Sequence, residues 1–138
     1  LKVSYDYVLV DIGRALSKIT LPLIQNADLV ALIISTDTST VSLTKTLLDY
    51  LKNKGVNISS IHGILNRAAG MEGLSKADAE KELGNKIMTT FPYLGSNLAF
   101  ANSRHRPFSL EFPKNTATII FQDAARDMEA LARKSRGL

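Results

Sequence analysis

Apolar residues gather in four short runs along the chain, and each run is followed by turn residues and a helical pattern. The runs are YVLVD at 7–11, LVALIIS at 29–35, SIHGILN at 60–66 and the weaker KIMTTFP at 86–92. Short uninterrupted apolar runs are typical of strands buried on both faces of a parallel sheet. The alternation of strand and helix therefore predicts an α/β fold with three layers, a mostly parallel sheet with helices on both faces.

Two helices are predicted before the third run. The first covers residues 15–26, where Pro22 either kinks the helix or lies in the first turn of its regular part. The second covers residues 38–54, begins at a cap on Asp37 or Thr38 and stops at Gly55. Its apolar face is predicted from helical spacing to contain Leu43, Leu47, Tyr50 and Leu51.

Two more helices are predicted in the second half of the chain. A short one opens at Ser75, which forms a capping-box pattern with Asp78, and ends at Gly84. The last begins near Asn115 after a turn-rich region. Its single apolar stripe consists of Ala117, Ile120, Phe121, Ala124, Met128 and Leu131.

Length and composition indicate one ordinary domain, residues 1–138, with 45% apolar residues. The chain has no cysteine, which excludes a disulfide framework and a thiolate zinc site and fits a reducing compartment. No apolar run is long enough to span a bilayer, and the N-terminus lacks a signal-peptide pattern. We therefore expect a cytoplasmic chain. Because it does not begin with methionine and enters a strand pattern at once, we also expect it to be part of a longer protein.

Neither the net charge nor the histidines indicate a specific function. The net charge of +4 is spread along the chain, and the clusters RHR at 104–106 and RKSR at 133–136 are interpreted as a solvated loop and a basic helix end. Nucleic-acid binding is therefore not specifically indicated. His62 lies in a predicted strand and His105 in a loop, without partners at ligand spacing, so neither is assigned a metal or catalytic role.

Polar residues follow the predicted strands where the carboxyl ends of a parallel sheet converge. Asp11 ends the first run, residues 35–37 the second, Asn66 and Arg67 the third, and Phe91 with Pro92 the fourth. This set is expected of a nucleotide or phosphate site at a topological switch point. Each residue has an alternative role: Asp11 as a helix cap, residues 35–40 as a capped helix entry, Asn66 as a partner of loop backbone, and Arg67 as a surface charge.

Several segments resemble the MinD and ParA type of P-loop ATPases. YDYVLVDIG is similar to the Walker B segment, GILNR to the strand that ends in an asparagine, and NADLVALIISTDTSTVSLTKTLLDYLKNKG to the unit between them. LSKADAEKELGNKIMTTFPYLGSNLAFANSRHRPF is similar to the segment that follows. The segment DIGRALSKITLPLIQNAD is most similar to the CpaE and TadZ branch of this family, which acts in pilus assembly. The resemblance covers essentially the whole chain.

The resemblance implies a nucleotide site in a longer parent protein. It places Asp11 where the family has a carboxylate linked to Mg²⁺ through water, and Asn66 with Arg67 where adenine is contacted. Phe91 and Pro92 begin the segment to Gly95 that would wall the base. ATP and Mg²⁺ are accordingly the cofactors expected of the parent. An asparagine amide can donate to and accept from adenine, and Mg²⁺ keeps water ligands, so these roles are chemically consistent.

The chain departs from the family in lacking the glycine-rich, lysine-bearing phosphate loop, and Ile12, Gly13 and Arg14 stand where a family switch sequence is expected. We therefore expect the C-terminal part of a P-loop NTPase-like domain, which alone binds no cofactor and is not catalytic. Its parent would act in subcellular positioning or pilus assembly, as a homodimer or with protein partners of such a system. Whether the parent hydrolyses ATP stays open.

Two alternatives remain. The fold could serve as a non-enzymatic interaction or localisation module in a multidomain regulator. A flavodoxin-like receiver is weaker, because the additional acidic pair and the strand-end lysine that receivers need are not apparent.

Overall fold

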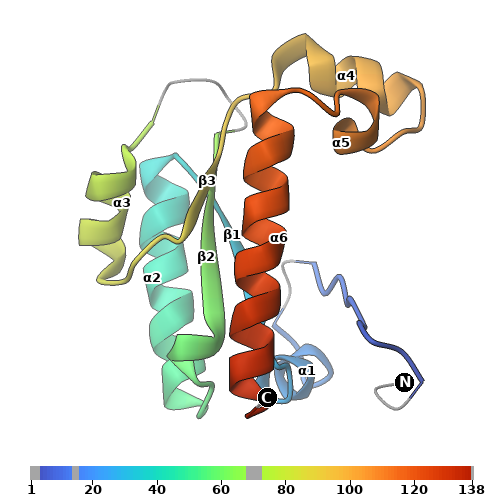
Figure 1. Ribbon diagram of the computed structural model, residues 1–138. Coiled ribbons are helices and arrows are strands. Elements are labelled where there is room, and N and C mark those ends of the chain that lie inside the picture. The colour runs from blue at the N-terminus through green and yellow to red at the C-terminus, as the bar shows by residue number, and fades with distance from the viewer. Residues whose placement is uncertain (1–3, 14–15, 68–72, 138) are drawn as a thin grey trace.

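The computed structural model describes residues 4–13, 16–67 and 73–137 and has an α/β architecture (Figure 1). Its parallel sheet has three strands in the order β1-β2-β3. The strands are β1 (Val30–Ser35), β2 (Ile61–Asn66) and β3 (Thr89–Phe91). The helices are α1 (Thr20–Gln25), α2 (Thr38–Asn53), α3 (Lys76–Leu83), α4 (Gly95–Ser103), α5 (Phe108–Glu111) and α6 (Thr116–Ser135), with a 3₁₀ turn η1 (Ile58–Ser60) before β2.

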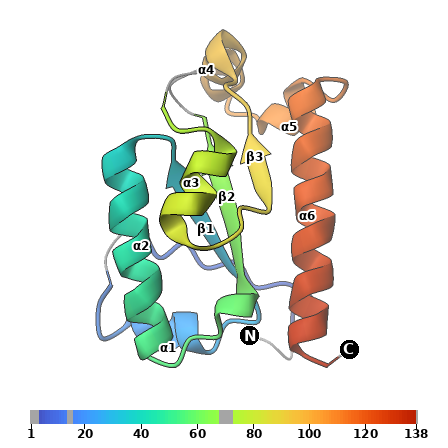
Figure 2. The same cartoon turned by 90° about the vertical axis from the view of Figure 1, so that its left-hand side faces the viewer.

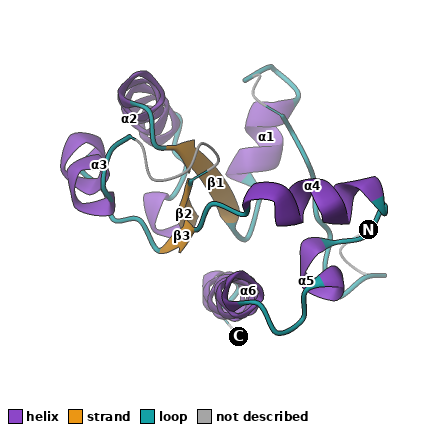
Figure 3. Ribbon diagram, turned by 90° about the horizontal axis from the view of Figure 1, so that it is seen from above, coloured by secondary structure: helices purple, strands orange, loops and turns teal. Residues whose placement is uncertain are grey.

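Helices cover both faces of the sheet, which confirms the predicted three-layer fold class. Helices α2 and α3 lie on one face, and the long helix α6 lies on the other (Figures 1 and 3). Helices α4 and α5 lie beyond the end of the sheet at which the strands terminate, next to the start of α6 (Figure 2). No helix in the described ranges is long and apolar enough to cross a membrane.

The two faces of the sheet follow from the alternation of side chains along β1 and β2. Ile34 and its register partner Leu65 belong to the main core, which packs against α2 and α3. Ile33 and its partner Ile64 consequently point to the opposite face, on the side of α6. The main core also contains Val41, Leu48, Leu51, Val56, Ala79, Leu83 and Ile87.

The predicted apolar face of α2 is partly confirmed, since Leu51 is in the core and Leu47 packs against it. Leu43 and Tyr50 are exposed, whereas Val41, Thr44 and Leu48 are buried with Leu51. Thr44 tolerates burial because its hydroxyl donates a 2.7 Å hydrogen bond to the carbonyl of Thr40 one turn earlier. The core side of α2 is therefore rotated toward Val41, Thr44 and Leu48 relative to the predicted face.

The predicted strand at 7–11 is wrong in this structure. Residues 4–10 are exposed and irregular, and Leu9 has 94% of its surface accessible. A strand needs neighbouring backbone to pair with, and the described residues place none beside this segment. A 2.6 Å hydrogen bond from the Tyr7 hydroxyl to Glu129 ties the segment to α6.

The other elements agree with the predictions in kind but differ in length. Pro22 lies in the first turn of α1, which settles the alternative of a kink. Strand β3 is shorter than the run at 86–92, and α4 and α5 form in the region predicted only as turn-rich. Helix α6 begins after Asn115, as predicted, and Ala117 and Ala124 of its apolar stripe are buried.

Candidate functional site

Four of the predicted site residues meet where β2 and β3 end. Asn66 and Phe91 are register partners in the parallel ladder, and the backbone N–H of Arg67 donates a 3.1 Å hydrogen bond to the carbonyl of Phe91. Pro92 follows directly. Because backbone hydrogen bonds fix both strand ends, Asn66, Arg67, Phe91 and Pro92 form one local group at the carboxyl edge of the sheet, which we call the β2–β3 edge.

Aromatic packing holds the β2–β3 edge against α6. The ring of Phe91 meets that of Phe121 edge to face, with 4.7 Å between the centroids. Phe121 in turn packs against Phe108 of α5 in the same manner at 5.9 Å. Edge-to-face pairs of this kind are favourable beyond the area they bury. Phe91 is therefore a packed anchor of the edge, and its half-buried ring is shared between the sheet and α6.

The side chains of Asn66 and Arg67 have unused hydrogen-bonding capacity. Both residues are half-buried, and neither side chain makes a hydrogen bond or ion pair within the part of the chain that the structure describes. An asparagine amide offers one acceptor oxygen and two N–H donors, and a guanidinium offers five donors. Polar groups at a sheet edge are usually satisfied by backbone or capping bonds, so these two are available to a ligand.

The end of β1 is occupied by structural interactions instead. Asp37 caps α2 by accepting a 2.7 Å hydrogen bond from the N–H of Thr40. The hydroxyl and N–H of Thr40, followed by the hydroxyl of Ser35, lower the pKa of the Asp37 carboxyl. The capping role predicted as the alternative for residues 35–40 is thus confirmed.

The loop before α3 packs tightly on the same strand end. The N–H of Leu74 donates a 2.7 Å hydrogen bond to the carbonyl of the buried Thr36. Gly73 has φ +90°, and a Cβ at this position would lie 2.5 Å from that carbonyl oxygen. Only glycine fits here without a shift of the backbone.

Asp11 is not brought to the β2–β3 edge by a strand. It is exposed in the irregular N-terminal segment, and its Oδ1 accepts a 3.0 Å hydrogen bond from the N–H of Gly13. Within 4–13, 16–67 and 73–137 no group of three or more histidine or acidic side chains is arranged to hold a metal ion. The role of Asp11 as a magnesium-linked carboxylate stays a prediction.

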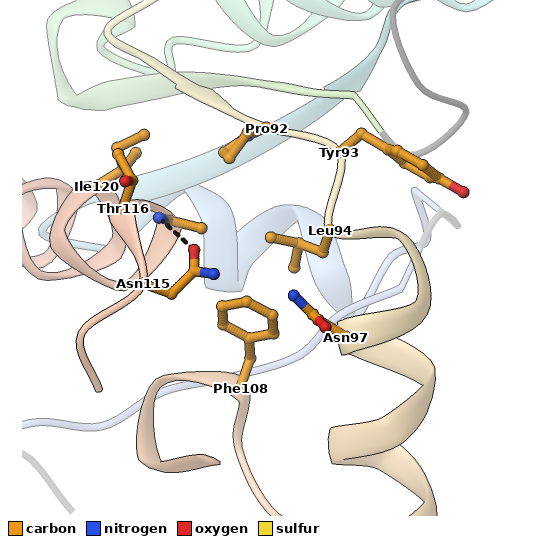
Figure 4. A pocket seen from close by; sticks show the side chains of 9 residues that line it. Pro92, Tyr93, Leu94, Asn97, Phe108, Asn115, Thr116 and Ile120 are labelled. Atoms are coloured by element: carbon orange, nitrogen blue, oxygen red, sulfur yellow. Dashed lines mark hydrogen bonds between the residues drawn. The ribbon is translucent and has the colours of Figure 1, made fainter. Parts of the chain in front are cut away.

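A cavity of about 200 Å³ adjoins the β2–β3 edge (Figure 4). Pro92 belongs to both, and the other walls come from α4, α5 and the start of α6. Asn115 caps α6 through its Oδ1, which accepts from the N–H of Ala117 at 2.9 Å. The sequence predicted Asn115 only as a helix start and gave no signal for Asn97 or Phe108, because it did not predict α4 and α5. The full lining is Pro92, Tyr93, Leu94, Asn97, Phe108, Asn115, Thr116, Ala117 and Ile120.

The base and the phosphates of a nucleotide make different demands on a binding site. The Asn66 amide and the Arg67 guanidinium, which have no partner among the described residues, are of the chemical kinds that hydrogen bond to and stack on a purine base. A triphosphate needs backbone N–H groups and cations, usually at a helix N-terminus. The helix after β1 instead begins with the carboxylate of Asp37, which repels phosphate. The N-terminus of α2 is therefore unsuited to bind phosphate.

No protein-family model matches this chain, and no curated protein matches its sequence. Among solved structures, the crystal structure of a ParA family ATPase from Chlorobium tepidum TLS matches with a TM-score of 0.77 and 22% sequence identity. The match covers 89% of this chain and 51% of that chain, so the present chain spans about half the length of the structure it resembles. At this identity the likeness shows the fold, and the chain has the fold of part of a ParA family ATPase.

Proposed function

We propose that this chain is the C-terminal segment of a MinD- or ParA-like ATPase, most similar to the CpaE and TadZ branch, and that it binds the base of ATP. The observation that carries the proposal is the position of Asn66 and Arg67 at the β2–β3 edge, where their side chains have no partner among residues 4–13, 16–67 and 73–137. The ParA-like fold supports it, because ligands of parallel α/β sheets bind outside the carboxyl ends of the strands.

In this proposal each residue of the edge has a distinct task. The Asn66 amide donates to and accepts from the polar edge of adenine, a pairing that discriminates adenine from guanine. The Arg67 guanidinium, which is planar and cationic, lies against the base or its neighbouring anionic groups. Phe91 and Pro92 form the wall of the base site, and Phe91 is held in place by its packing on Phe121.

In this proposal the phosphates are held elsewhere in the parent protein. When bound, ATP with Mg²⁺ supplies the phosphoryl group and the charge on which hydrolysis depends. Asp11 is the residue of this chain proposed to reach the metal through water. Alone, the chain is proposed to be inactive. Nucleotide-dependent dimerisation or association with other proteins would then serve subcellular positioning or pilus assembly.

Calorimetric titration of Mg-ATP into the natural polypeptide that contains these residues tests the proposal. We expect Asn66→Ala to weaken ATP binding by about tenfold, because loss of one buried polar contact costs on the order of 1–2 kcal/mol. Asn53→Ala is the matched control: Asn53 is exposed at the last residue of α2, at the opposite end of the sheet, and binding should be unchanged.

Competition between ATP and GTP tests whether Asn66 selects adenine over guanine. The natural polypeptide should prefer ATP, and Asn66→Ala should reduce that preference. Equal binding of ATP by the natural polypeptide and by Asn66→Ala would contradict the assignment of the base to this edge.

A second candidate is a non-enzymatic interaction or localisation module. The observation that favours it is the carboxylate of Asp37 at the start of α2, which repels phosphate at the helix N-terminus that follows β1. If neither the natural polypeptide nor the 138-residue chain binds nucleotide, this candidate replaces the first.

A further inference from the structure

Helices α4 and α5 and the turn between them carry an exposed aromatic ring next to two arginines. The two helices pack on each other beyond the end of the sheet, and no other described element covers the outer side of α4 (Figures 1 and 2). We call Phe100, Arg104 and Arg106 the α4–α5 surface. Its residues are contiguous, because the Arg104 guanidinium lies over the ring of Phe100 and both arginines pair with Glu111.

Helix α4 exposes apolar residues because they are distributed around its whole circumference. Leu98, Ala99, Phe100 and Ala101 are consecutive, and successive residues of an α-helix point about 100° apart. Packing on one side can therefore bury only some of them: Ala101 is buried, whereas Leu98 is 40% and Phe100 49% exposed. A helix that is apolar all round is normally buried. The uncovered ring of Phe100 consequently favours contact with a partner.

The exposed charges of this region all have the same sign. Residues 92–115, which the structure describes throughout, contain three cations, Arg104, Arg106 and Lys114, and one acid, Glu111. The Glu111 side chain is only 11% exposed, whereas those of the two arginines are 54% and 51% exposed. An acidic partner is therefore complementary to this region, and a basic one would be repelled.

Glu111 cannot saturate the two guanidiniums. Nε of Arg104 lies 3.4 Å from Oε1 of Glu111, and Nη1 of Arg106 lies 3.2 Å from Oε2. A guanidinium has five N–H donors, whereas a carboxylate accepts about four hydrogen bonds in all. One carboxylate shared by two arginines leaves an excess positive charge and unused donors. Both features suit a second carboxylate, supplied by a partner.

Backbone hydrogen bonds fix the turn that carries the arginines. The N–H of His105 donates to the carbonyl of Asn102 at 3.0 Å, and the N–H of Arg106 donates to that of Ala101 at 3.1 Å. This pattern is a Schellman motif, and His105 accordingly has a left-handed backbone with φ +51°. The backbone on both sides of His105 is thus ordered before a partner binds, which lowers the entropic cost of binding.

We infer that the α4–α5 surface binds an acidic segment of another protein that also carries apolar side chains. Carboxylates of this segment pair with Arg104 and Arg106, and an apolar side chain next to them covers the ring of Phe100. The inference goes beyond the proposed function, because it does not depend on a nucleotide at the β2–β3 edge.

Two observations favour a protein segment over a nucleic acid as the partner. The guanidinium of Arg104 lies 5.6 Å from the centroid of the Phe100 ring and so covers a face on which a base would stack. The net charge of residues 92–115 is only +2, with three cations and one acid. Nucleic-acid affinity depends on the neutralisation of several phosphates, which so few cations do not provide.

Fluorescence anisotropy of the natural polypeptide with two labelled synthetic peptides tests the inference. One peptide repeats the unit Glu-Leu-Glu-Phe, and the other repeats Lys-Leu-Lys-Phe. We expect the acidic peptide to bind at least about tenfold more tightly than the basic one, and more weakly as salt is added. Equal binding of the two peptides, or no binding of the acidic one, would overturn the inference. Tighter binding of a single-stranded DNA oligonucleotide would overturn it as well, because a nucleic acid would then be the partner.

A pair of substitutions tests whether the acidic peptide binds at this surface. Arg106→Gln removes one charge while Arg104 still pairs with Glu111, and it should weaken binding of the acidic peptide by about three- to fivefold. Arg126→Gln is the matched control: Arg126 is an exposed arginine of α6, and binding should be unchanged. Equal effects of the two would contradict the inference. If Arg106→Gln does not fold, the comparison of the two peptides on the unsubstituted polypeptide still decides.

The peptide measurements separate this inference from the proposed function. A natural polypeptide that binds the acidic peptide through Arg106 but binds no nucleotide would refute the proposed function and leave the α4–α5 surface intact. One that binds ATP through Asn66 but does not bind the acidic peptide would refute the α4–α5 surface alone.

Discussion

Gly73 shows how a single residue sets the position of a whole loop. Its backbone, at φ +90°, passes against Thr36 so closely that a methyl group would overlap the carbonyl oxygen. Gly73→Ala should reduce the free energy of unfolding by more than about 2 kcal/mol, since a conformational cost of about 1–2 kcal/mol adds to the overlap. Denaturant unfolding measures the change.

Gly55→Ala provides the comparison for this prediction. Gly55 has a similar φ of +79°, and nothing lies within 4 Å of an added Cβ. Gly55→Ala should therefore reduce the free energy of unfolding only by the conformational cost of a positive φ. Equal losses at the two positions would mean that the close approach to Thr36 has no energetic consequence.

His62 is a buried histidine, and its burial disfavours the protonated, charged form of the ring. The side chain is almost fully buried on the α6 face of the sheet, and its Nε2 lies 3.0 Å from the hydroxyl of Thr89. Burial lowers the pKa of His62 from its ordinary value of 6.5, and the charge of Asp127 opposes this only in part. The folded state consequently binds its proton less readily than the unfolded state does.

Stability should therefore fall as the pH is lowered through the ordinary range of histidine. The free energy of unfolding is expected to decrease below about pH 6.5, with a slope of at most about 1.4 kcal/mol per pH unit from this group. His62→Gln, which can keep the bond to Thr89, should flatten that slope. An unchanged slope between about pH 5.5 and 7.5 in His62→Gln would contradict the assignment.

Among the secondary-structure elements, α2, α3 and α6 begin at capping side chains, and the sequence predicted the position of each cap. Ser75 caps α3: the N–H of Asp78 donates to its Oγ at 3.1 Å, and the Ser75 hydroxyl donates to Asp78 at 2.6 Å. Ser75→Ala should cost about 1 kcal/mol in unfolding free energy, the usual loss for an N-cap.

Ser39→Ala is the control for this cap. Ser39 is exposed in the first turn of α2 and its side chain makes no hydrogen bond within the described residues. Alanine favours helix, so the change should be neutral or slightly stabilising. A Ser75→Ala variant that is as stable as Ser39→Ala would show that the cap is dispensable.

Elements that depend on distant partners were harder to predict. The runs at 29–35 and 60–66 became β1 and β2 because each finds a parallel neighbour. The run at 7–11 has the same apolar character but stays irregular, since pairing is a property of two segments. Helices α4 and α5 were missed because the region between Tyr93 and Lys114 has little amphipathic periodicity and is stabilised by aromatic contacts among Phe100, Phe108 and Phe112.

The positions of the site residues were predicted correctly where the strands that precede them form in the structure. Asn66, Arg67, Phe91 and Pro92 converge as the parallel sheet required. Asp11 does not join them through a strand, because its own run lacks a partner in this structure. The cavity walls from α4 and α5 could not be inferred, since those helices were not predicted.

For the whole molecule, the chain has the fold of part of a ParA family ATPase, and Asn66, Arg67, Phe91 and Pro92 gather at the carboxyl edge of its parallel sheet. Ligands of parallel α/β sheets bind outside this edge. The proposed function therefore predicts that a nucleotide base binds at the β2–β3 edge.

A crystal structure of the natural polypeptide with ADP and Mg²⁺ would show directly whether the base binds at the β2–β3 edge. We expect the adenine ring at this edge, with its polar edge hydrogen bonded to the Asn66 amide and one face against Pro92. An adenine ring bound elsewhere, with the Asn66 amide still unpartnered, would contradict it.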